Sequence, residues 1–450
     1  MGTLGVAQHE KSDQGPRLGA TRNQDEDRKR TLPRVTSITD VAERQLCTGC
    51  GVCAYLQPGE ITMVDDRKSG RRPLVNRSPD GAPPSTDEAL QVCPGASLGH
   101  PAKPEPEVDG VDPMWGPVLE IWEGYAAAPD IRFSASSGGA ATALALHGIE
   151  CGMTHGILHI RARPSEPLRN ETVLSHDREA MLSATGSRYA PASPCDRLDL
   201  IESAPGPCTF IGKPCDVAAA QRARKIRSAL DCNLGLTIAI FCAGTPTYRG
   251  TSEMLKLMGI EDESTVKSVR YRGNGWPGEA EAIVETSEGG TESRRLSYDE
   301  SWGGVLQKHR QWRCYVCADH TGEFADVAVG DPWYRPIEPD EHGWSLIIAR
   351  TEVGRRAIQA AIDDGYLVAK NMPGSSIGAS QPGLSKGRGA VWGRTTASRL
   401  LGIPSPRYSG LPMFRAWLRL PFVKKLRSTL GLVRRAHRKR LWSRHPVEPM

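Results

Sequence analysis

The sequence lacks several features that would assign it to a common class of protein. It has no run of about 18 apolar residues, so no segment is expected to span a membrane. Residues 1–30 lack the apolar core of a secretory signal peptide, and the first residues lack the Ser or Thr that best completes a myristoylation signal. We also find no P-loop, no Gly-x-Gly-x-x-Gly opening a helix, and no recognisable Ser/His/Asp set. These absences favour a cytoplasmic protein.

Cysteine, by contrast, is plentiful, with twelve residues in the chain. Without a secretory signal the compartment is expected to be reducing, and clustered cysteines are then better interpreted as metal ligands than as disulfides. Four cysteines stand apart from any cluster, and we interpret them as small buried apolar residues or as incidental: Cys151, Cys195, Cys208 and Cys232.

Positive charge is concentrated at one end of the chain. The net charge is +5, but residues 411–445 carry eleven Lys or Arg and no Asp or Glu. The rest has 46 basic and 52 acidic residues, a net charge of −6. The body therefore gives no reason to expect nucleic-acid binding.

A chain of 450 residues is expected to form two or three domains. Composition predicts a disordered N-terminus, a small cysteine-bearing unit, a Pro-rich linker, a main body, and a Gly/Ser-rich then basic tail. The corresponding ranges are 1–34, 35–100, 101–114, 115–372 and 373–450.

The main body alternates short apolar runs with helical patterns. Residues 136–152 are predicted to form a helix with Ser136 or Ser137 as its N-cap. The runs 208–212 and 235–241 are typical of buried strands joined by a crossover helix, which predicts neighbouring parallel strands. Residues 345–351 and the segment after them repeat the strand-then-helix pattern. We therefore predict an α/β or α+β fold.

In the tail, apolar residues recur at helical spacing on both sides of Pro421. Three interpretations remain open for this basic, amphipathic segment. The first is that it lies on an anionic membrane surface, the second that it is solvated or contacts a partner protein, and the third that it binds nucleic acid.

The first cysteine motif is "CTGCGVC", which places Cys47, Cys50 and Cys53 at two-residue spacing. Ferredoxins usually close such a run with a cysteine followed by proline, and "QVCPGA" supplies this pair at Cys93. The pattern indicates a 4Fe-4S cluster, with zinc or a coincidental pattern as the alternatives.

A second group of cysteines is scattered along the chain. Cys215 and Cys242 each follow a predicted strand, so parallel strands would bring both to one carboxyl edge. Cys314 and Cys317 form a CxxC pair. The pattern alone leaves an iron–sulfur cluster, a zinc ion and no metal as open alternatives.

Small residues gather at two further places. "SASSGGAA" opens the helix of residues 136–152, where free N–H groups suit a phosphate or pyrophosphate. "GSRY", residues 186–189, is either a simple turn or an anion contact. The alternative for the first segment is a capped helix that packs closely on a sheet.

Nine motifs in order resemble the family of beta subunits of coenzyme F-420 hydrogenases and dehydrogenases, which includes the 7-hydroxymethyl chlorophyll a reductases. They cover roughly residues 40–370 and are "CTGCGVC", "CPG", "SSGG", "GSRY", "IGKPCD", "FCAGTP", "RCYVCAD", "ADVAVGDPW" and "GWSLIIARTEVG".

The resemblance implies a small ferredoxin-like iron–sulfur unit followed by a mixed α/β flavin-binding body, divided into residues 115–205 and 206–372. It makes the scattered cysteines ligands of a second 4Fe-4S cluster: Cys215, Cys242, Cys314 and Cys317. It makes the following residues candidates for contact with FAD: Ser136, Ser137, Gly138, Gly139, Gly186, Ser187, Arg188 and Tyr189.

Three polar residues of the matching segments are ambiguous. Asp326 and Asp331 occupy positions typical of the family and act either as structural caps or in the chemistry. Lys213 stands where many relatives have Thr, and it is either a cation beside the second cluster or the flavin, or a surface lysine.

These observations favour an FAD and 4Fe-4S oxidoreductase that exchanges electrons with ferredoxin or another redox protein. Its substrate would be coenzyme F-420 or a small organic molecule. Two alternatives are a non-catalytic electron-transfer subunit of a partner enzyme and a zinc-stabilised binding protein.

Overall fold

The computed structural model describes residues 34–77, 81–338 and 342–450. The N-terminal segment predicted to be disordered lies outside the described residues, apart from Arg34. Across the described ranges, no helix combines the length and the apolar character needed to cross a bilayer.

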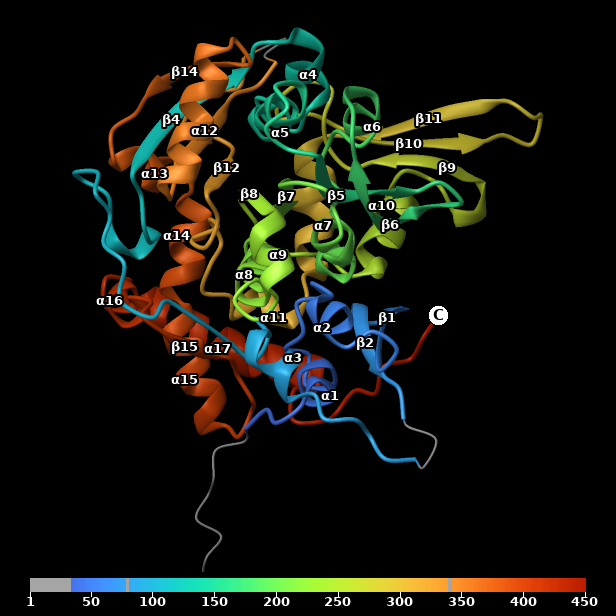
Figure 1. Ribbon diagram of the computed structural model, residues 1–450. Helices are drawn as coiled ribbons and strands as arrows, with labels where there is room; N and C mark the ends of the chain where they lie inside the picture. The colour runs from blue at the N-terminus through green and yellow to red at the C-terminus, as the bar shows by residue number, and fades with distance from the viewer. Residues whose placement is uncertain (1–33, 78–80, 339–341) are drawn as a thin grey trace, which may run out of the picture.

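One large mixed sheet forms the centre of the molecule (Figure 1). Its eight strands have the spatial order β14-β4-β13-β12-β8-β7-β5-β6. Strands β5, β7, β8 and β12 are parallel, and the other pairings are antiparallel. The predicted mixed α/β body is confirmed. The bounds are β4 (Glu120–Ala126), β5 (Gly156–Arg163), β6 (Glu166–Ser175), β7 (Cys208–Gly212), β8 (Leu234–Ile240), β12 (Val327–Gly330), β13 (Ser345–Ala349) and β14 (Leu367–Asn371).

Helices cover both faces of this sheet. Alternate residues of its strands point to opposite sides, and the apolar residues on each side pack against helices. In β7, Phe210 joins one apolar core with Val217 of α8, and Ile211 joins the other with Leu144 of α5 and Ile358 of α12. The predicted strand–helix–strand unit is therefore present as β7, α8 and β8. The helical segments around the sheet are α4 (Pro129–Ser134), α5 (Ala140–Glu150), α6 (Arg178–Leu182), η2 (Pro194–Arg197), α7 (Asp199–Glu202), α8 (Pro214–Ala223), α9 (Ser228–Asn233), α10 (Tyr248–Leu257) and α12 (Glu352–Asp363).

The predicted N-cap of α5 is wrong. The helix begins at Ala140, and its N-cap is Gly139, whose φ of 79° lies in the left-handed region that favours glycine. The two serine hydroxyls make other bonds: that of Ser136 accepts from the Ser187 N–H, and that of Ser137 donates to the Trp344 carbonyl. These bonds hold residues 136–139 as a loop over the sheet edge.

A smaller antiparallel sheet of order β11-β10-β9 lies beside the main one. It is followed by short helical segments that lead to the CxxC pair. The bounds are η3 (Glu263–Thr265), β9 (Val266–Arg270), β10 (Ala280–Glu285), β11 (Thr291–Leu296), the π-helix η4 (Asp299–Val305), η5 (Leu306–His309) and α11 (Trp312–Tyr315).

The cysteine-bearing N-terminal segment forms helices around the two-stranded sheet β1–β2. Its segments are α1 (Ile38–Glu43), α2 (Val52–Leu56), β1 (Ile61–Asp66), β2 (Gly70–Val75), α3 (Asp87–Val92), β3 (Ser97–Gly99) and η1 (Pro113–Trp115). Its ferredoxin-like character and the division of the chain into six segments stay predictions.

The C-terminal tail packs on this N-terminal segment (Figure 1). Strand β15 pairs in parallel with β3, and Leu432, Ala436 and Leu441 share an apolar core with Cys47 and Cys93. The two amphipathic helices predicted around Pro421 are present as α16 and α17. The tail segments are α13 (Ser375–Ser380), α14 (Pro382–Gly389), α15 (Val391–Leu400), β15 (Arg407–Ser409), α16 (Met413–Leu418) and α17 (Phe422–Lys439).

Candidate functional site

The first cysteine set gathers where α1, α2 and α3 meet. Cys47 and Cys50 lie in the loop before α2, Cys53 lies within α2, and Cys93 follows the last residue of α3. All four are buried. The glycines between the first three have φ of 78° and 90°, a backbone shape that turns the loop around the thiols.

The thiols of this set lie close enough to act on one another electrostatically. The pKa of Cys53 is raised well above its usual value, first by burial and then by Cys47, Cys50 and Cys93. Burial, with Cys50 and Cys47, raises the pKa of Cys93 to about 12. Ligation requires these thiols to lose their protons, so a bound positive centre would have to offset this cost.

A fifth cysteine contacts the set. The Cys195 N–H donates to the Cys50 carbonyl at 2.8 Å, and its thiol hydrogen-bonds the sulfur of Cys50, which lowers the Cys50 pKa. The sulfur of Cys195 also lies 3.2 Å from the carbonyl oxygen of Asp216, which is an alternative acceptor for its one proton. The interpretation of Cys195 as an isolated buried cysteine missed this position.

The second cysteine set gathers at the carboxyl edge of β7 and β8. Cys215 lies in the first turn of α8, and Cys242 follows β8; the parallel pairing of these strands brings both to one edge, as predicted. Cys314 lies in α11, and Cys317 follows it. The pKa of Cys215 is raised well above its usual value, chiefly by burial and also by Cys242 and Cys317. The four residues come together from three separate parts of the chain.

Arg313 lies between the two sets. Its guanidinium is buried, interacts electrostatically with Cys47 of the first set, and interacts with Cys215, Cys314 and Cys317 of the second. Its Nη2 donates to the carbonyl of Pro94 at 2.8 Å. Its Nε and Nη1 have no hydrogen-bond partner within the described ranges. Buried cations with unused donors suit an anionic group held by thiolates.

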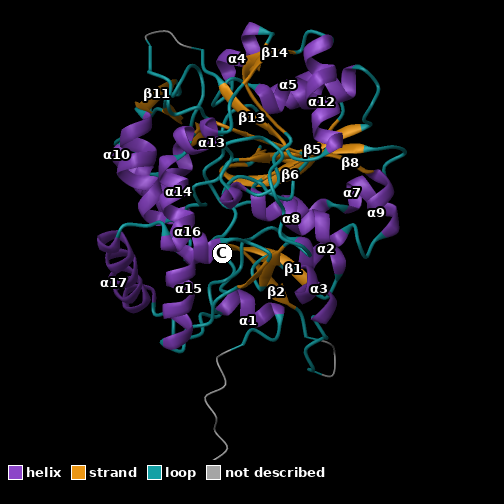
Figure 2. Ribbon diagram, turned by 90° about the vertical axis from the view of Figure 1, so that its left-hand side faces the viewer, coloured by secondary structure: helices purple, strands orange, loops and turns teal. Residues whose placement is uncertain are grey.

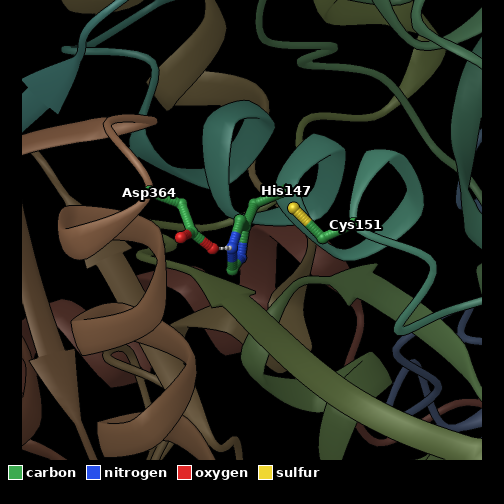
Figure 3. Close-up of side chains that lie close together, drawn as sticks. All are labelled: His147, Cys151 and Asp364. Carbon is green, nitrogen blue, oxygen red and sulfur yellow. Dashed lines mark hydrogen bonds and ion pairs between the residues drawn. The ribbon is translucent and has the colours of Figure 1, made fainter.

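A further group of possible metal ligands lies away from both cysteine sets. Among the described residues, His147, Cys151 and Asp364 bring one possible ligand atom each within 4.8 Å of one another (Figure 3). There, His147 Nε2 lies 2.7 Å from Asp364 Oδ2 and ties the end of α5 to the turn after α12. This group was not predicted and lies at the opposite end of α5 from the predicted site.

A cavity of about 300 Å³ opens beside the second set. Its volume is at the lower end of the range for small-molecule sites. Eight of the nine residues predicted to lie at a cofactor line it: Ser136, Ser137, Gly139, Gly186, Ser187, Arg188, Tyr189 and Lys213. The ninth, Gly138, lies behind this wall, where its N–H donates to the Ser345 hydroxyl at 3.0 Å.

The predicted wall residues differ in what they can offer a ligand. The Arg188 guanidinium is bonded to protein oxygen atoms, including those of Asn170 and Val269, so its donors are already used. Lys213 forms a 2.6 Å ion pair with the buried Asp216 at the start of α8. Of the two ambiguous aspartates, Asp326 accepts hydrogen bonds from Thr237 and is structural there.

The second ambiguous aspartate faces the cavity within an aromatic group that the sequence did not reveal. Asp331 accepts two hydrogen bonds from Arg272, at 2.9 and 2.7 Å. The ring of Trp333 stacks on those of Trp276 and Tyr298, each with centroids 5.4 Å apart. The motif "GDPW" holds two of these residues, but their partners come from distant segments. The cavity therefore has one apolar, aromatic side.

Cys242 belongs both to the second cysteine set and to the cavity wall. Arg313 and Cys195 in turn join the second set to the first. The molecule therefore contains one continuous series of sites: first cysteine set, second cysteine set, cavity.

Comparisons with known proteins identify the family of this chain. The family described as coenzyme F-420 hydrogenase/dehydrogenase, beta subunit, matches with its N-terminal part over residues 121–198 and with its C-terminal part over residues 208–374. The coenzyme F-420 hydrogenase subunit beta of Methanococcus voltae is 25% identical over 54% of this chain and 81% of its own length. One of the subunits of the F(420)H(2) dehydrogenase of Methanosarcina mazei is 23% identical over 76% of this chain and 89% of its own.

A chain in a solved structure of the F-420-reducing [NiFe] hydrogenase complex from Methanosarcina barkeri is 23% identical, with a TM-score of 0.44. It covers 58% of this chain and 84% of its own length. The two family matches together span more than half of the 450 residues. The chain belongs to the family of coenzyme F-420 hydrogenase/dehydrogenase beta subunits, whose members are named as parts of oxidoreductases.

Proposed function

We propose that this protein is an iron–sulfur flavoprotein oxidoreductase with two 4Fe-4S clusters and FAD. The main observation behind this proposal is that Cys242 belongs to the second cysteine set and also lines the cavity. An electron carrier held by that set would touch a ligand bound in the cavity, with no intervening layer of protein.

The donor sets support two clusters rather than two zinc ions. Each set has four cysteines, and the first combines two-residue spacing with a closing Cys-Pro pair, which is the ligand pattern of a 4Fe-4S cluster. Arg313 places a buried positive charge with unused N–H donors between the sets, where it would stabilise electrons added to either cluster. The first site would be held by Cys47, Cys50, Cys53 and Cys93.

The cavity wall supports FAD. The first residues of α5 line the cavity, and the N-terminus of this eleven-residue helix presents N–H groups suited to a pyrophosphate. Ser136 and the turn at Gly186 to Tyr189 form the adjacent wall, while the stacked rings beside Asp331 suit a flat heteroaromatic group. Bound FAD supplies the exchange of one electron with a cluster and two with a substrate.

The lysine that departs from the family pattern has a defined role in this arrangement. Lys213 lines the cavity beside Cys242, and Asp216 holds its ammonium group in place. Burial lowers the pKa of Lys213, but Asp216 and the neighbouring thiols together raise it by more, so the net shift of this pKa is upward. The group therefore stays a cation and would stabilise negative charge on either side of the cavity wall.

The names of the relatives guide the proposed substrate. Relatives are named for coenzyme F-420 hydrogenase and F(420)H(2) dehydrogenase, so this deazaflavin is the first substrate to test, with small organic molecules next. The electron partner would be ferredoxin or another redox protein. Because the relatives are named as subunits, a second candidate function is a non-catalytic electron-transfer subunit of a partner enzyme.

Anaerobic purification followed by metal, sulfide and flavin analysis tests the proposal. We expect about eight irons and eight acid-labile sulfides per chain, with about one FAD. Zinc without sulfide would contradict it and support a zinc-stabilised binding protein. Bleaching of the flavin by reduced F-420 would favour the oxidoreductase, whereas cluster absorbance with no flavin would favour the electron-transfer subunit.

A further inference from the structure

Helix α17 has three different faces. One face is buried against the N-terminal segment through Ser428, Leu432 and Ala436, which recur every four residues. This face holds the tail on the body of the protein. The other two faces are exposed and lie on the outside of the molecule, where Figure 2 shows α17 at the edge of the fold.

The second face of α17 is an exposed apolar stripe. Phe422, Leu426 and Leu430 are 77%, 51% and 61% exposed, and Val433 continues the line at helical spacing. In α16, just before it, Phe414 and Leu418 are 48% and 51% exposed. Large apolar residues that remain exposed in a row mark a binding surface rather than ordinary surface composition.

The third face of α17 is positively charged. Lys424, Arg427, Arg434 and Arg438 are all exposed and lie next to the apolar stripe. None of the four makes an ion pair with any residue that the structure describes. Residues 411–445 contain no acidic residue that would neutralise them. The stripe is therefore flanked by free positive charge.

We propose that α16 and α17 bind the surface of an anionic lipid bilayer. An apolar stripe of Phe, Leu and Val beside a row of Lys and Arg is the pattern of helices that lie in the membrane interface. A protein partner fits less well, because the cores of protein interfaces are depleted in charged residues and a partner would need a matching row of acidic side chains to pair with this one. The buried face of α17 would stay on the protein while the stripe enters the lipid. This inference is independent of the cofactors proposed above.

Vesicle sedimentation of the full-length protein tests this inference. We expect binding to phosphatidylcholine vesicles that contain about 30% phosphatidylserine, and weak binding to phosphatidylcholine alone. The double variant Leu426→Ser/Leu430→Ser and the triple variant Arg427→Gln/Arg434→Gln/Arg438→Gln should each lower the partition coefficient at least about tenfold. The altered side chains are exposed, so far-UV spectra and melting temperatures should not change.

Leu257→Ser is the matched control, because Leu257 is 55% exposed but lies on α10, outside the stripe. This variant should bind as the unaltered protein does. Equal sedimentation of all four proteins, or of none, would overturn the proposal. A change of oligomeric state in the Leu426→Ser/Leu430→Ser variant without any vesicle binding would assign the stripe to a protein contact and would overturn it as well.

Discussion

Replacing Cys93 separates the two proposed clusters. Cys93 follows α3 and is far in sequence from the other three thiols of its set, yet it interacts electrostatically with Cys47, Cys50 and Cys53. Alanine is the better replacement, because a serine oxygen could still bind iron. The Cys93→Ala variant should lose the cluster of the first set and leave the second intact.

The magnitude of this loss follows from the two sets of four ligands. Iron and acid-labile sulfide should each fall from about eight to about four per chain. Flavin content should stay at about one per chain, because Cys93 does not line the cavity, whereas Cys242 of the second set does. The remaining cluster should be detected by EPR after chemical reduction.

Two matched variants control this experiment. Cys232→Ala removes an exposed cysteine outside both sets and should leave iron unchanged. Cys195→Ala removes the buried thiol that contacts Cys50 and should also leave about eight irons, because its sulfur lies against the Asp216 carbonyl oxygen and is outside both sets of four. Unchanged iron in Cys93→Ala, or loss of half the iron in Cys195→Ala, would refute the assignment of Cys93 as the fourth ligand.

Three further predictions concern charged groups. Lys213→Met leaves the Asp216 carboxylate buried without its partner, so the free energy of unfolding measured by urea titration should fall by about 3 kcal/mol. The double variant Lys213→Met/Asp216→Leu should recover most of this loss. A single variant as stable as the unaltered protein would contradict the prediction. Arg313→Gln removes the buried positive charge between the sets, so the midpoint potentials of both clusters should fall by some tens of millivolts in EPR-monitored titrations. Arg313→Lys keeps the charge and should shift the potentials less. Unchanged potentials in Arg313→Gln would show that Arg313 does not stabilise the reduced clusters. Burial lowers the pKa of His159 to about 4, so as the pH falls the unfolded chain takes up a proton on this residue first, near pH 6.5. The free energy of unfolding should therefore fall by about 2 kcal/mol from pH 7 to pH 5. The His159→Gln variant should show a smaller fall over the same pH range.

The sequence predicted the parts of the site that depend on local pattern. The strands that precede Cys215 and Cys242 are short apolar runs, and their parallel pairing follows from the helix between them. The two-residue spacing of Cys47, Cys50 and Cys53 is enough by itself to indicate a shared site. The full second set and the cavity wall came from the family resemblance, because no local rule joins residues as far apart as Cys242 and Cys314.

The parts that sequence reasoning missed depend on long-range packing. Arg313 is one residue before a predicted ligand, yet nothing local indicates that its guanidinium reaches toward the first set as well. Trp276, Tyr298 and Trp333 form one stack only after the small sheet folds beside the large one. The N-cap of α5 was misplaced because both serine hydroxyls bond to distant backbone groups instead.

The contact between the tail and the first cysteine set affects how the protein is assembled. Cys47, Cys53 and Cys93 are made well before Leu432 and Ala436, the residues that complete their apolar surroundings. Until Leu432 and Ala436 have been made, the apolar core around these cysteines is incomplete. If the first set holds the proposed cluster, a cluster-delivery protein would have access before α17 docks, and docking would then cover the site. The order of synthesis would in that case set the time window in which the cluster can be loaded.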